Sequence, residues 1–262
     1  MRLLLPVFKD LPLVSGAAIR NPAKLGLTPR APNLKIVLWQ GADVLAEHIL
    51  MTDQLYLIHF YLDQFFSVSQ LQQASLATVE LTEASKNLFE CQLLLKSVET
   101  SSRGSVLYDL LIDRPKTHRY SPILHCGYSS YCQGENETWA LLLNYRPYLK
   151  EEKPEEQKMQ LRLRDDQGSI LKEREFTIPY NSTTLISYAK EFASPLQHRD
   201  GSSLVFLGGA SQFAIFTLFL NRRTGGIGIE HSLAPFYYCS GAADPQSRPH
   251  FLKIAFSKQD HP

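Results

Sequence analysis

The sequence contains an internal repeat whose period is about the size of a domain. Residues 34–45, LKIVLWQGADVL, align with residues 159–171, MQLRLRDDQGSIL, and Ile36 falls on Leu161 at an offset of 125 residues. After the short turn in each stretch, the residues align at an offset of 126. A repeat of this length predicts two related copies of one folding unit.

Further matches follow in the same order along the chain. Residues 20–22 fall on residues 143–145, and residues 57–60 fall on residues 185–188, at offsets of 123 and 128. Any two β domains share alternating patterns, but a chance resemblance would not keep this order at so constant an offset. The repeat therefore predicts an internal duplication. The copies are expected at residues 1–118 and 119–245, followed by a polar tail at residues 246–262.

The local patterns within each copy predict strands. Ile36 and Leu38 lie two residues apart, as do Leu161 and Leu163, and this period of two is typical of half-buried strands. Residues 165–168, DDQG, form a turn signal, because Asp starts such turns and Gly supplies a positive φ. Short strands with regular turn signals predict an all-β chain, built as two tandem antiparallel β-sandwich domains.

The return strand after this turn has an unusual composition. Residues 170–178, ILKEREFTI, carry four consecutive charges, as suits an edge strand that must avoid pairing with another molecule. Helix is expected only at residues 62–73 and 188–192, which follow the same strand in the two copies. The apolar residues at 60–62 and 65–66 suit either a protein contact or the core.

The composition excludes two classes of partner. Hydrophobic residues make up 44% of the chain, which is enough to bury a core. The formal charge of +1 lacks the basic excess of proteins held on nucleic acid, so no nucleic-acid partner is expected. No apolar run approaches the roughly 20 residues that cross a bilayer, so no membrane insertion is expected.

The N-terminal residues and the cysteines indicate a cytoplasmic location. The apolar run that begins at Leu3 is cut by Pro6 and ended by Lys9, short of the roughly 7–15 apolar residues of a signal peptide. These residues are expected to form a first strand. The cysteines are too few for a dense disulfide framework and are expected to be free thiols. They are Cys91, Cys126, Cys132 and Cys239.

The second copy contains a more specific order of motifs. A strand ends in Gly127-Tyr128, the turn Asn136-Glu137-Thr138 leads to residues 140–144 (ALLLN), and Tyr237-Tyr238 comes last. Between them lie Ile178-Pro179, Leu185-Ile186 and residues 214–221.

This order resembles the sensory rhodopsin transducer family and its relatives, which are small β-sandwich proteins that assemble as oligomers. The resemblance covers about half of the chain. The turn at residues 136–138 lacks the central His of the family, and residues 218–223, LFLNRR, replace its Gln-His-Thr-Arg stretch. The resemblance implies a non-enzymatic binding, adaptor or assembly module with a pocket for a sugar-like ligand.

A group of cysteines and histidines in the second copy suggests zinc, because thiolates and imidazoles are its usual ligands. The group comprises His125, Cys126, Cys132, His231 and Cys239. Five residues separate Cys126 from Cys132, against about two to four in structural zinc sites, and His125 and Cys126 point to opposite faces of a strand. We therefore expect buried thiols that act as small hydrophobic residues, with neither a metal nor a cofactor.

A ligand site is expected at the rim around His231, where an apolar strand ends before Pro235. Tyrosines supply stacking surfaces, and Arg222 suits a phosphate or carboxylate. In the alternative interpretation, the tyrosines pack in the core and His231 satisfies a strand end. The candidate ligand-binding residues are Tyr128, Glu137, Arg222, Glu230, His231 and Tyr238.

The sequence contains no motif for catalysis. It has no nucleophile elbow, zinc-protease helix, phosphate loop or dinucleotide fingerprint, and residues 224–228, TGGIG, suit a hairpin turn. We therefore expect a non-catalytic binding or assembly protein, an adaptor or scaffold, whose partner is another protein or a second copy of itself. Two alternatives remain: a module that binds carbohydrate or a small polar ligand through Tyr128 and Tyr238, and an enzyme that uses His231 with Glu137 or Glu230.

Overall fold

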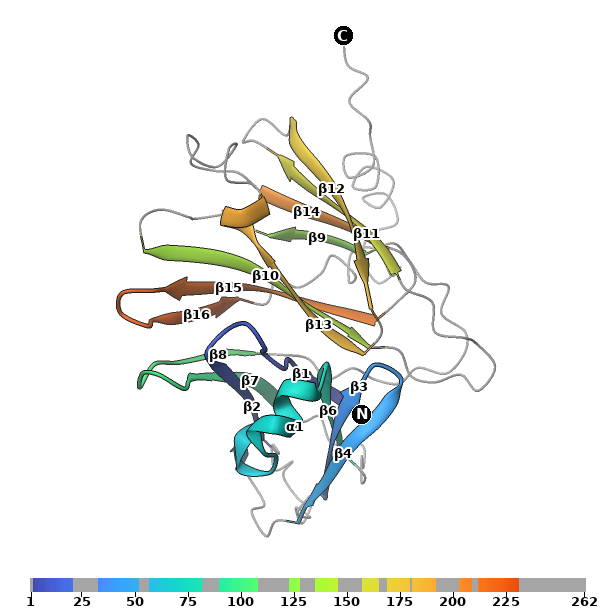
Figure 1. The fold of residues 1–262 in the computed structure, drawn as a ribbon, viewed down its shortest axis with the longest axis vertical. Helices are drawn as coiled ribbons and strands as arrows, with labels where there is room; N and C mark the ends of the chain where they lie inside the picture. The colour runs from blue at the N-terminus through green and yellow to red at the C-terminus, as the bar shows by residue number, and fades with distance from the viewer. Residues whose placement is uncertain are drawn as a thin grey trace, which may run out of the picture.

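The structure, a computed structural model, consists almost entirely of antiparallel β-sheet in the residues that it describes. The prediction of an all-β chain with antiparallel sheets is confirmed. Four sheets of four strands each form two groups, one in each half of the chain (Figure 1). The described residues are 2–20, 33–51, 57–81, 90–107, 123–127, 135–145, 157–164, 169–179, 181–191, 203–208 and 212–230.

The first half of the chain contributes eight strands in two sheets. Sheet A has the order β1-β6-β3-β4, and sheet B has the order β5-β2-β7-β8. The expected first strand is β1. The eight strands are β1 (Arg2–Leu5), β2 (Leu13–Arg20), β3 (Leu34–Gln40), β4 (Asp43–Leu50), β5 (Leu57–Tyr61), β6 (Leu76–Leu81), β7 (Glu90–Ser97) and β8 (Arg103–Leu107).

The second half repeats this arrangement strand by strand. Sheet C has the order β12-β11-β14-β9, and sheet D has the order β13-β10-β15-β16, so each strand holds the place of the strand eight earlier. Among the strands that the structure describes, each pairs only with strands of its own half. The strands are β9 (Ile123–Gly127), β10 (Asn136–Tyr145), β11 (Gln157–Arg164), β12 (Ile170–Ile178), β13 (Ser182–Ser187), β14 (Ser203–Gly208), β15 (Gln212–Asn221) and β16 (Ile227–Glu230).

An irregularity in the pairing recurs at the same place in both halves. The register of β3 against β4 shifts by one residue between Leu38 and Trp39. The register of β11 against β12 shifts between Leu163 and Arg164, which lie 125 residues further along. The predicted hairpin of β11 and β12 is confirmed, and β12 is an edge strand as its charges predict. The expected turn at residues 165–168 lies outside the described residues.

The predicted helix at residues 62–73 is interrupted. A short 3-10 turn, η1 (Leu62–Gln64), is followed by α1 (Val68–Gln73). The break has a local cause, because Ser67 caps α1: the Gln70 N–H donates to the Ser67 Oγ, and the Ser67 N–H donates to the Gln70 Oε1. Residues 188–191 form the second expected helix.

The two sheets of the first half share one apolar core. Leu3 and Leu5 of β1, Leu38 of β3 and Leu93 of β7 are fully buried in it. Three of the residues that suited either a protein contact or the core, Phe60, Leu62 and Phe66, are also buried there, so they belong to the core.

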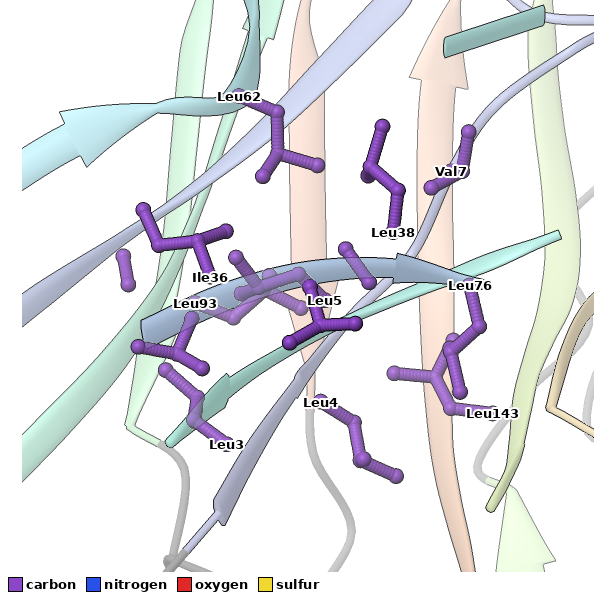
Figure 2. Close-up of a cluster of buried hydrophobic side chains, with 14 of the residues drawn as sticks. Leu3, Leu4, Leu5, Val7, Ile36, Leu38, Leu62, Leu76, Leu93 and Leu143 are labelled. Atoms are coloured by element: carbon purple, nitrogen blue, oxygen red, sulfur yellow. The ribbon is translucent and has the colours of Figure 1, made fainter. Parts of the chain in front are cut away.

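Sheet D joins this core from the second half. Figure 2 shows Leu143 of β10 among the side chains of the first half. Leu141 of β10 and Phe216 of β15 belong to the same cluster, whereas Leu142 and Ile215 point the other way, into a second core with Leu161 of sheet C. Sheet D therefore packs on both of its faces and connects the two halves.

Direct contacts between the halves occur at both ends of this junction. The ring of Trp39 meets that of Tyr145 edge-on, with centroids 6.2 Å apart. At the other end, β8 runs beside β16, and Gly104 packs against Ile227 closely enough that an added Cβ would lie 3.0 Å from it (Figure 1).

Polar groups connect the halves around Ser75. Its hydroxyl lies 2.6 Å from the Asn181 carbonyl oxygen and accepts the Gly41 N–H at 3.0 Å. The Asn181 amide nitrogen donates to the Gly41 carbonyl at 3.0 Å, and the Thr183 N–H donates to the Ser75 carbonyl at 2.7 Å. Asn181 is buried with φ at +41°, in the left-handed region that Asn tolerates better than most residues.

Candidate functional site

Two of the six candidate ligand-binding residues meet on sheet D. Glu137 lies near the start of β10, opposite Leu220 of β15, and Arg222 follows the end of β15. The Arg222 Nη2 atom lies 2.5 Å from the Glu137 Oε1 atom, with side-chain exposures of 68% and 16%. Each charge therefore already has a partner within the chain.

Asn221, which directly precedes Arg222, makes hydrogen bonds beside this pair. The Asn221 amide donates to the Asn136 Oδ1 atom at 2.8 Å, and its own oxygen accepts the Thr224 N–H at 2.8 Å. Gly225 has φ at +68°, which glycine adopts without strain. The sequence TGGIG is therefore part of a hairpin turn between β15 and β16, as predicted.

The remaining candidates do not join this pair in the described residues. Glu230 is exposed at the far end of β16, opposite Thr217. Thr217 lies three residues, or about 10 Å, along β15 from Leu220, the residue opposite Glu137. Tyr128, His231 and Tyr238 lie outside the described residues.

The cysteine and histidine group is described only in part. The backbones of His125 and Cys126 belong to β9, but their side chains, like Cys132 and Cys239, lie outside the described residues. Cys91 is buried, and its sulfur is not part of a disulfide. Within the described ranges, no three His, Cys, Asp or Glu side chains gather as a metal site would require.

No motif in the sequence marks the surface of β4 as a candidate site. This strand is one of the two edge strands of sheet A, and among the described strands it pairs with β3 alone. Val44 is 49% exposed, Ile49 is 63% exposed, and Met51, which directly follows the strand, is 78% exposed. A long edge with exposed apolar side chains is a site where another chain can add a strand.

The shift in register places these residues on one face. Val44 pairs with Trp39, and Ile49 pairs with Lys35, so both lie on the same face of sheet A. Glu47 lies between them on that face, and its carboxylate is 2.6 Å from the Lys35 ammonium group. The exposed apolar residues therefore flank an ion pair that is already satisfied.

The opposite face of β4 points toward sheet B. His48 stacks on Phe65, with ring centroids 4.3 Å apart, and Phe65 in turn contacts Phe60 of β5. Leu50 packs partly against the core on this face. One face of β4 therefore packs against sheet B, whereas the other face exposes the apolar side chains of Val44 and Ile49.

The equivalent edge strand of the second half has a different surface. By the pairing of the strands, Ile49 corresponds to Glu175 and His48 to Arg174 of β12. Arg174 and Glu175 are exposed, and Arg174 lies 3.6 Å from Glu191. Charges in the middle of an edge strand oppose the addition of another strand. β12 has this protection at four consecutive positions, whereas β4 has less of it, because the equivalent residues are Ala46, Glu47, His48 and Ile49.

Comparison with known proteins gives no relative: no protein-family model, no curated protein and no solved structure matches the chain. Among the described residues, no helix has the length and apolar character needed to cross a membrane.

Proposed function

We propose that the chain is a non-catalytic binding and assembly protein, an adaptor or scaffold, that acts in the cytoplasm through contacts with protein. The observation that carries this proposal is the exposed apolar edge of β4, set against the charged edge of β12. Both strands have the same place in their sheets, so the fold itself does not demand an apolar edge. A contact surface accounts for the difference.

The proposal includes an origin by duplication of one β-sandwich unit, with domains at residues 1–118 and 119–245. The common strand order and the recurring register shift support it. Gln92 and Leu94 of sheet B correspond by strand pairing to Phe216 and Leu218 of sheet D. Phe216 and Leu218 are fully buried against the first half, whereas Gln92 is exposed and Leu94 is partly exposed.

Unequal copies suit a binding protein. In the second half, one face of sheet D packs against the first half and is not available for another partner. In the first half, the edge strand β4 remains exposed. Because Glu137 of β10 and Arg222, which follows β15, neutralise each other, a small charged ligand is a weaker candidate for the bound partner than a protein surface.

Native mass spectrometry of the purified chain, before and after treatment with a chelator, tests this proposal. We expect a defined oligomer or protein complex whose mass does not change with the chelator. A monomer that loses a zinc ion to the chelator would contradict the proposal and direct attention to the cysteine and histidine group of the second half.

A further inference from the structure

We infer that the partner at β4 is a second molecule of this chain, whose β4 pairs antiparallel with the first across a two-fold axis at Ile49. The inference rests on the proposed function and gives it a surface and an occupant. It would join two A sheets into one continuous sheet of eight strands.

Symmetry limits the registers that such a pair can adopt. A two-fold axis perpendicular to a sheet keeps each side chain on its own face, so directly opposed residues are of the same face. The axis then lies midway between the two copies of one residue, and that residue defines the register. Beyond the register shift, β4 pairs regularly with β3 from Ala46 to Leu50. Axes through Glu47, His48 and Ile49 keep the new pairing centred in this regular part.

Charge and packing distinguish the three registers. An axis at Glu47 would place two carboxylates directly opposite each other, which is destabilising between strands. An axis at His48 would oppose two imidazoles, each already stacked on Phe65. An axis at Ile49 opposes no like charges.

The register at Ile49 also covers the most exposed apolar side chains. It brings together the two Ile49 residues, each 63% exposed, and places Met51, 78% exposed, opposite Glu47 of the other molecule. On the other face it places His48 opposite Leu50. Since Lys35 already neutralises Glu47, no uncompensated carboxylate is buried at this contact.

Disulfide trapping tests the register. Directly opposed residues in antiparallel strands have Cα atoms about 4.5–5.5 Å apart, within the range that a disulfide spans. An Ile49→Cys variant, oxidised with copper phenanthroline, should therefore form a covalent dimer. Val44→Cys is the matched control, because the two copies of residue 44 would lie ten residues, or about 33 Å, apart along the strands.

The wild-type chain, oxidised in the same way, supplies the background from the native cysteines. Trapping at position 49 above that background, with none at position 44, supports the inference. Trapping at position 44, or a dimer in solution that is not trapped at position 49, overturns the register while leaving the proposed function intact. A chain that stays monomeric at every concentration overturns the inference, and the chelator experiment then decides the proposed function separately.

Discussion

Gly16 lies at a point of sheet B that has no room for a side chain. A Cβ atom added there would lie 2.0 Å from the Phe60 carbonyl oxygen and 2.9 Å from the Tyr61 Cα atom. Both neighbours are backbone atoms of β5, so they cannot turn away as a flexible side chain could. The identity of this residue is therefore dictated by the close approach of two strands.

We expect Gly16→Ala to lower the free energy of unfolding by about 1–3 kcal/mol, the usual cost of forcing an extra group into a packed site. Chemical denaturation measures this change. Gly228→Ala is the matched control, because a Cβ at Gly228 would meet Phe219 at an ordinary contact distance of 3.4 Å. Equal stability of the two variants would show that β2 and β5 are further apart than the structure places them.

At the scale of elements, the hairpin of β15 and β16 contains two neighbouring polar residues, Asn221 and Arg222, whose contributions to stability should differ. The Glu137–Arg222 ion pair lies beside Asn221, which connects β15 to β10 and holds the turn. An ion pair with one exposed partner contributes little, whereas a side chain that satisfies several backbone and side-chain groups contributes more.

Arg222→Ala should therefore change the free energy of unfolding by less than about 1 kcal/mol. Asn221→Ala should cost about 1–3 kcal/mol, because the Asn136 side chain and the turn lose their partner. Thermal unfolding of the two variants compares them directly. A larger loss for Arg222→Ala than for Asn221→Ala would contradict this ranking.

Several elements could be predicted from the sequence because their cause is local. The period of two predicted strands, the turn signal at residues 165–168 predicted the hairpin of β11 and β12, and the four charges predicted that β12 is an edge strand. The interruption of the helix at Ser67 has a local signal as well, since Gln70 follows Ser67 by three residues.

The candidate site was less predictable because its causes are not local. The sequence marked Glu137 and Arg222 as polar rim residues, but their meeting depends on the pairing of β10 with β15, which are far apart in the chain. The exposed row on β4 depends on a one-residue shift in register, which brings Val44 onto the face of Ile49. Alternation alone does not report such a shift.

For the whole molecule, the central feature is that one core extends across both halves. Side chains of sheets A, B and D belong to a single buried cluster. The chain should therefore unfold in one cooperative transition, because loss of the first half would expose the apolar face of sheet D that packs against it.

A pair of equivalent leucines tests this dependence. Leu218 is fully buried between the halves, and its counterpart Leu94 is only partly buried on the outer face of sheet B. Leu218→Lys should lower the free energy of unfolding by at least about 3 kcal/mol, because an unpaired charge enters the core. Leu94→Lys should cost about 1 kcal/mol or less. Denaturant titration of both variants, followed by circular dichroism, makes the comparison. Similar losses at the two sites would argue against a core shared between the halves.

Self-association through β4 is most directly tested by sedimentation velocity of the full chain over a range of concentrations. We expect a dimer for the wild type. For Ile49→Lys we expect a shift toward monomer, with a dissociation constant raised at least about tenfold, since two ammonium groups would face each other at the axis. Leu107→Lys is the control, because Leu107 is 67% exposed on a different edge strand and should leave the dimer unchanged. A wild-type chain that remains monomeric, or an Ile49→Lys variant that dimerises as well as the wild type, would contradict the account.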